Sequence, residues 1–131
     1  MNKRLLLTVV AVFTAWSILD FVIHGVLLQA TYEATAELWR PMEEMNMSLM
    51  YLVTLVFTAS FVLIYGLLIT PKTLASGVKF GVLFGLATGV SMGFGSYTYM
   101  PIPLSLAWAW FFGTLVEATL AGAIVGAMVK R

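Results

Sequence analysis

Cysteine is absent from the 131-residue chain, and charged residues make up only 10% of it. Without thiols, disulfide bonds, thiolate catalysis and cysteine-based metal sites are excluded. The shortage of charge excludes a soluble domain, which needs far more polar surface. The chain has no basic patch beyond the helix ends and no nucleophile paired with a base. We therefore expect no nucleic-acid partner. Enzymatic activity stays open only as intramembrane chemistry, and no nucleophile–base arrangement supports it.

Hydrophobic residues account for 61% of the chain and gather in four long stretches. These are Leu5–Leu28, Met47–Ile69, Val78–Met100 and Leu104–Val129. Each is longer than the roughly 20 residues that a helix needs to cross a bilayer. The sequence therefore predicts one all-α domain over residues 1–131. This domain is an integral membrane four-helix bundle, with the lipid bilayer as its immediate partner.

Lysine and arginine are distributed unevenly over the two sides of the predicted bundle. If the four spans alternate in direction, Arg40 lies on one side. The opposite side holds Lys3, Arg4, Lys72, Lys79, Lys130 and Arg131. The positive-inside rule makes that side cytoplasmic. We expect both termini in the cytoplasm and the protein in the cytoplasmic (inner) membrane of a bacterium or archaeon.

The first outer connection, residues 29–45, has no glycine and a single proline, Pro41. Proline suits the first position of a helix. Glu43 and Glu44 would then lie in the first turn, where carboxylates interact favourably with the helix dipole. We expect the first helix to continue to about Trp39 and the second to begin at Pro41, forming an outer helical hairpin. The alternative is an interfacial helix lying flat on the membrane.

Glycine recurs at every fourth position along the third stretch. The positions are Gly77, Gly81, Gly85, Gly89 and Gly93. Four residues turn a helix by about 400°, so the glycines form a slowly drifting band. The fourth stretch has small residues of its own, including Gly122 and Gly126. Such bands let helix backbones approach closely, which predicts helix packing. The alternative is that they line a passage or accept a planar cofactor.

Asp20, His24 and Glu117 lie well inside the predicted spans, away from the charged residues at the cytoplasmic ends. Asp20 and His24 are four residues apart and would share one helix face. Glu117 continues a row of small residues through Ala109 and Gly113, which predicts that it points into the bundle. At 1.5 Å per residue, Asp20 and Glu117 lie about 20–24 Å from the cytoplasmic charges. We therefore expect the two acids to approach each other.

Three interpretations of these residues remain open. They can form a buried structural cluster, with Asp20 and His24 as an ion pair. They can relay protons or cations, because carboxylates and histidine inside a membrane exchange protons. In the third interpretation, His24 holds a metal or a haem. Met42, Met45 and Met50 extend this idea, because thioethers suit Cu(I) and would share a helix face, although methionine more often packs at interfaces.

The leading functional hypothesis is the passage of protons, cations or a small solute. In it, Asp20 and Glu117 titrate and His24 tunes or relays. The alternative is an accessory or assembly subunit that docks on a larger membrane complex through its glycine-rich helix. Copper or haem handling is the third hypothesis. Because four helices barely enclose a site, we expect a homo-oligomer or a larger complex. No cofactor can be identified from the sequence.

Overall fold

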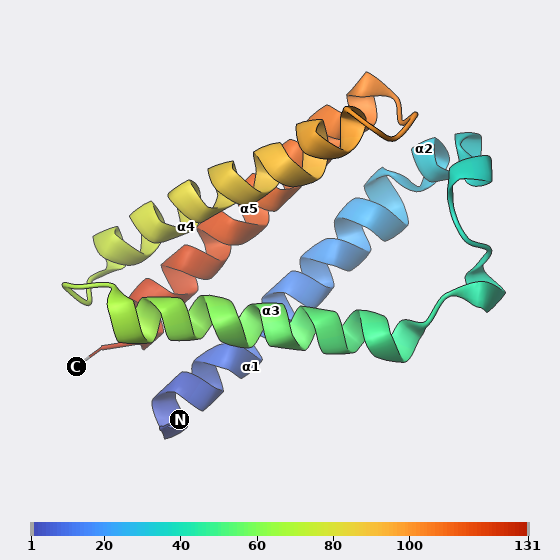
Figure 1. The fold of residues 1–131 in the computed structure, drawn as a ribbon. Helices are drawn as coiled ribbons and strands as arrows, with labels where there is room; N and C mark the ends of the chain where they lie inside the picture. The colour runs from blue at the N-terminus through green and yellow to red at the C-terminus, as the bar shows by residue number, and fades with distance from the viewer. Residues whose placement is uncertain (1, 131) are drawn as a thin grey trace.

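The computed structural model describes residues 2–130, and over this range the regular structure is entirely helical, without strands. Arg131, one of the positive charges considered above, lies outside the described residues. Four helices are long and apolar enough to cross a membrane: Lys3–Leu27, Met47–Leu68, Leu74–Gly95 and Leu104–Met128 (Figure 1). The prediction of an all-α chain with four apolar membrane helices is confirmed.

Two of the four spans change helix type along their length. The first consists of α1 (Lys3–Val22) and a π-helical segment, Ile23–Leu27. The third consists of α4 (Leu74–Val90) and a second π-helical segment, Ser91–Gly95. It begins before the predicted Val78 because Thr73 caps it, its side chain accepting a hydrogen bond from the Ser76 backbone N–H. The other two spans, α3 (Met47–Leu68) and α5 (Leu104–Met128), are α-helical throughout.

The predicted outer helical hairpin is wrong. A short helix, α2 (Gln29–Ala34), is followed by a 3₁₀ turn at Ala36–Leu38, an extended stretch and another 3₁₀ turn at Met42–Glu44. The reason lies at Pro41, because a residue that precedes proline is disfavoured in the α region. Arg40 is the residue restricted in this way, and the chain is already extended one residue earlier, at Trp39, with φ −117° and ψ 150°.

The second span begins at Met47 instead of Pro41. Asn46 caps α3, its side chain accepting a hydrogen bond from the Leu49 backbone N–H at 3.0 Å. Glu43 and Glu44 therefore belong to the isolated 3₁₀ turn and not to the first turn of α3. The connection between the first two spans is thus a chain of short turns.

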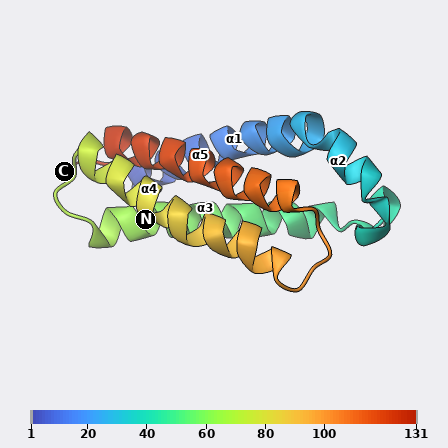
Figure 2. The ribbon, with the colours of Figure 1, turned by 90° about the horizontal axis from the view of Figure 1, so that it is seen from above.

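The helices α4 and α5 run side by side in both views of the ribbon (Figures 1 and 2). Glycines on α4 bring the two backbones together, and Gly77, Gly81, Gly85 and Gly89 are all buried. A Cβ atom added at Gly81 would lie only 2.9 Å from the Gly122 Cα atom. At Gly77 the corresponding distance to the Gly126 Cα atom is 2.6 Å. No side chain fits between these backbones, so larger residues are excluded from this row.

Both ends of the described chain lie at the same end of the bundle as the α3–α4 connection (Figure 1). The Arg4 guanidinium donates a hydrogen bond to the Met128 carbonyl oxygen at 3.0 Å. The Lys72 ammonium donates to the carbonyl oxygens of Ile69 and Tyr65 at the C-terminal end of α3, where positive charge interacts favourably with the helix dipole. We call this the basic end and the opposite one, with residues 28–46 and 96–103, the far end.

Apolar packing is divided into two clusters along the bundle. The larger lies toward the basic end and joins α1, α3 and α5 through buried residues such as Trp16, Phe61 and Val125. The smaller lies at the far end, where Tyr32 and Trp110 are among the residues that pack on a buried core. Asp20, His24 and Glu117 belong to neither cluster and lie between them, on the first span and on α5.

Candidate functional site

Asp20 of α1 and Glu117 of α5 line one cavity of about 150 Å³, which we call the Asp20 cavity. All four spans contribute to its wall. Its other lining residues include Trp16, Thr54, Phe57, Phe84, Thr88 and Thr114. The expected approach of the two acids therefore takes place inside a cavity, with three threonine hydroxyl groups and three aromatic rings around them.

A second cavity of about 170 Å³ lies nearer the far end, and we call it the His24 cavity. Its walls include His24 from the first span, Met92 from the π-helical end of the third span, and Tyr32 and Trp110. Thr114 and Glu117 line both cavities. Glu117 therefore stands at the boundary between them.

The Glu117 carboxyl group lacks a donor in its present surroundings. Its Oε1 atom is buried and has no hydrogen-bond partner within residues 2–130. Asp20 lines the same cavity, and a hydrogen bond between the two carboxyl groups would require a proton on one of them. With both ionised, two like charges share one cavity, which is unfavourable. A proton or a cation between the two groups would remove this repulsion.

The backbone around Glu117 is held by α1. The Trp16 indole Nε1 donates a hydrogen bond of 2.8 Å to the Glu117 carbonyl oxygen. The Trp16 side chain is only 5% exposed, and its ring lies 5.3 Å from that of Phe61, centroid to centroid. A buried, directional contact of this kind sets the separation between α1 and α5 at the level of the two acids.

His24 does not form the ion pair with Asp20 that one interpretation required. Among the described residues no ion pair joins them, and His24 Nδ1 instead lies 2.6 Å from the Tyr32 hydroxyl oxygen. The short helix α2, which follows the first span, instead places the Tyr32 hydroxyl group against the His24 ring.

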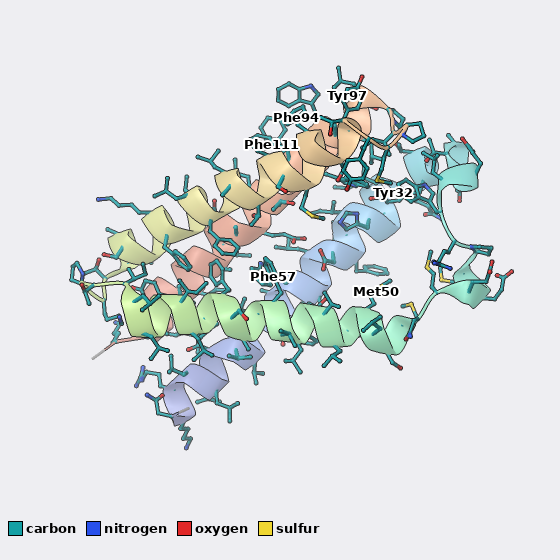
Figure 3. All side chains as sticks on the ribbon, viewed as in Figure 1. Tyr32, Met50, Phe57, Phe94, Tyr97 and Phe111 are labelled. Atoms are coloured by element: carbon teal, nitrogen blue, oxygen red, sulfur yellow. The ribbon has the colours of Figure 1, made fainter. Side chains whose placement is uncertain are left out.

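Tyr32 connects the first span to α5 at the far end (Figure 3). Its hydroxyl oxygen accepts a hydrogen bond from the Trp110 indole Nε1 at 2.8 Å. Burial raises the pKa of the Tyr32 phenol, so the hydroxyl group keeps its proton at neutral pH. That proton can be donated to His24 Nδ1, which leaves the ring proton of a neutral His24 on Nε2.

Tyr32 and Trp110 are site residues that sequence reasoning missed. Trp110, Thr114 and Glu117 follow a spacing of four and three residues, so they share a face of α5. That spacing was available as a signal once Glu117 was chosen as an anchor. Tyr32 gave no comparable signal, because its position depends on how residues 28–39 fold back over α5.

The three methionines of the copper hypothesis do not share a helix face. Met42 lies in the second 3₁₀ turn, Met45 is extended and Met50 is on α3, because α3 begins only at Met47. His24 is hydrogen-bonded to Tyr32. Within residues 2–130 no group of three or more histidine, aspartate or glutamate side chains could hold a metal ion.

No family model, curated protein or solved structure matches this chain. The site is therefore interpreted from its own geometry.

Substitution of Tyr32 by phenylalanine is expected to loosen the far end. The change removes one hydroxyl group and leaves His24 Nδ1 and Trp110 Nε1 without their partner, at a cost of about 1–3 kcal/mol. Hydrogen–deuterium exchange of the amides in residues 29–39 should become faster. Tyr99→Phe is the matched control, because Tyr99 is 78% exposed. Equal exchange in both variants would contradict a bridging role for Tyr32.

Proposed function

We propose that the chain passes protons or small cations across the bilayer, with Asp20 and Glu117 as the groups that carry them. The observation that carries this proposal is the position of Glu117, whose side chain lines both cavities. A titrating group at such a boundary exchanges its proton or cation with one cavity and then with the other. Inside a membrane, an ionisable residue without a structural partner is by default a functional candidate.

The two cavities are suited to water and protons. About 10–15 Å³ is enough to hold one water molecule, so each cavity has room for several. Waters need polar partners, which the hydroxyl groups of Thr54, Thr88 and Thr114 supply. In the proposed path, a proton reaches Glu117 from the His24 cavity and is shared with Asp20. Repulsion between two ionised acids favours its uptake.

The packed cluster toward the basic end opposes an open pore. Phe61 and Tyr65 are fully buried there, and the ring of Phe61 packs against Trp16 and Phe84. Passage from the Asp20 cavity to the basic end therefore requires the helices to move, as in a carrier. The π-helical segments Ile23–Leu27 and Ser91–Gly95 support such movement, since π-helical turns are frequent at functional sites. By the positive-inside rule, we assign the basic end to the cytoplasm.

The accessory-subunit alternative gains less support from the structure. Its proposed docking face was the glycine band, and Gly77, Gly81, Gly85 and Gly89 are buried against α5. A docking partner would therefore need another surface.

A purely structural role also leaves the buried Glu117 Oε1 unexplained, because a buried polar atom without a partner is costly. Residues of a single copy of the chain line both cavities. Homo-oligomerisation stays a prediction.

Flux through reconstituted protein tests the proposal. Purified protein in liposomes with an imposed pH gradient should dissipate that gradient faster than protein-free liposomes, as read with a pH-sensitive dye. Asp20→Asn should slow the flux by about tenfold, equivalent to about 1.4 kcal/mol of activation free energy. The matched control is Glu37→Gln, which neutralises an exposed acid in the first 3₁₀ turn and should leave flux unchanged.

The same assay separates protons from other cations. Replacing sodium or potassium by a large impermeant cation should not change a pure proton flux, whereas a cation flux should stop. A wild-type rate equal to that of empty liposomes under every ionic condition contradicts the proposed function.

A further inference from the structure

The Asp20 cavity is lined by both acidic groups and aromatic rings. Asp20 and Glu117 supply its two acidic groups, and α3 and α4 contribute only hydroxyl and apolar side chains. Trp16, Phe57 and Phe84 place aromatic rings around the same space. The Trp16 and Phe57 ring centroids are 5.5 Å apart, and those of Phe57 and Phe84 are 5.7 Å apart. The three rings thus form one connected aromatic group beside the acids.

This combination suits an organic cation better than a hydrated metal ion. Carboxylates attract a positive charge, and the faces of tryptophan and phenylalanine attract it as well. Quaternary ammonium groups are recognised in this way, because their methyl groups fit apolar walls and their charge is spread over the surface. Two of these rings, Trp16 and Phe84, also pack in the apolar cluster toward the basic end, so the aromatic wall of the cavity is held in place by the core.

The volume of the cavity limits the size of such a ligand. The Asp20 cavity measures about 150 Å³. An engineered apolar cavity of about this volume in another protein accepts benzene. A ligand of five or six non-hydrogen atoms is therefore the right size, whereas a tetrabutylammonium ion is too large.

The position of the cavity also suits a ligand with apolar groups. Val53 and Phe57 line it from α3 and are 58% and 44% exposed. Figure 3 shows Phe57 on the side of α3 that is turned toward the other helices. Because Val53 and Phe57 are only partly covered by those helices, this wall of the cavity is open to the surroundings. The opening offers an alkylammonium ion a route into the cavity.

We propose that the Asp20 cavity binds a small alkylammonium ion between its two carboxyl groups and its three aromatic rings. Binding and protonation then compete for Asp20 and Glu117. If the path described above also operates, the ion is exchanged for protons, and this exchange rests on the proposed function. Binding of the ion does not depend on it.

Calorimetric titration of the full-length protein in detergent with tetramethylammonium tests this inference. Binding should saturate and should weaken as the pH is lowered, because protons compete for the same two acids. Tetrabutylammonium and the neutral tert-butanol should not bind measurably, the first because of its size and the second because it has no charge. Tetramethylammonium that fails to bind, or that binds no better than tert-butanol, overturns the inference.

Two substitutions separate the cavity from non-specific uptake. Phe57→Leu keeps an apolar side chain but removes the ring, and should weaken binding at least about fivefold. The matched control is Phe21→Leu, because Phe21 is 69% exposed and is not a wall of the cavity. Equal losses in the two variants would show partition into the micelle and overturn the inference.

Failure of this inference can be distinguished from failure of the proposed function. Proton flux without any tetramethylammonium binding overturns the alkylammonium site and leaves the proton path intact. Specific, pH-dependent binding without any flux establishes the site and refutes transport. Flux in which an alkylammonium gradient drives protons in the opposite direction supports both.

Discussion

Glu117→Gln is expected to reduce proton or cation flux by at least about a hundredfold, the lower part of the range found when a proton-transferring group is removed. Glutamine has nearly the shape of glutamate but cannot release a proton or balance a cation. Among residues 2–130, Glu117 is the only ionisable residue that lines both cavities, so we expect no neighbouring group to replace it. The measurement is the rate of dissipation of a pH gradient in liposomes that contain equal amounts of folded protein.

Stability of the same variant distinguishes a functional acid from a structural one. The Glu117 Oε1 atom has no hydrogen-bond partner among the described residues, so loss of its charge removes no structural bond. Thermal unfolding of Glu117→Gln should therefore occur at the wild-type temperature or above it. Glu117→Asp retains a carboxyl group and should recover part of the flux. A destabilised glutamine variant with wild-type flux would contradict the proposed role of Glu117.

Gly81→Leu is expected to prevent assembly of the α4–α5 pair. Even a Cβ atom at Gly81 would contact the Ala118 carbonyl oxygen and lie 2.9 Å from the Gly122 Cα atom. Overpacking of a core usually costs about 1–3 kcal/mol, when side chains can shift aside. Here the obstacle is backbone, so we expect a larger loss and an aggregated or unfolded product. Size-exclusion chromatography and thermal unfolding in detergent measure the outcome.

Ala87→Leu provides the matched control for this prediction. Ala87 lies on the same helix but is exposed, so the added side chain meets lipid instead of α5. Its effect on stability should stay within about 0.5 kcal/mol, as for surface substitutions generally. Equal stability of the Gly81→Leu and Ala87→Leu variants would show that α4 does not approach α5 through its glycines.

The parts of the fold that could be predicted from the sequence are those that the membrane environment determines. Inside a membrane the backbone N–H and C=O groups of a long apolar stretch must be hydrogen-bonded to each other, and a helix does this within a single segment. The four spans were therefore predictable, although their ends were less so. The third begins at Leu74 because Thr73 caps it, and this local hydrogen bond was not anticipated. The predicted outer hairpin was wrong because proline disfavours the α region at the residue before it, here Arg40. The prediction rested only on the preference of proline for the first position of a helix.

The site was only partly predictable. Asp20, His24 and Glu117 stand out because ionisable residues are rare in membrane spans, and a count of residues per helix placed the two acids at one depth. The partner of His24 was not predictable from the four-residue spacing to Asp20. His24 bonds to Tyr32, eight residues away, because the short helix α2 places that hydroxyl oxygen 2.6 Å from His24 Nδ1.

The sequence by itself determined that this is an all-α membrane protein with four apolar spans, and that Asp20, His24 and Glu117 lie away from the span ends. These properties depend on composition and local spacing, which each segment carries alone. Tertiary structure decided that Glu117 lines two cavities, that Tyr32 joins His24 to Trp110, and that Phe57 and Phe84 stand beside the acids. These relations join residues far apart along the chain. They depend on how closely glycine lets α4 approach α5, and on how α1 and α3 then pack around that pair.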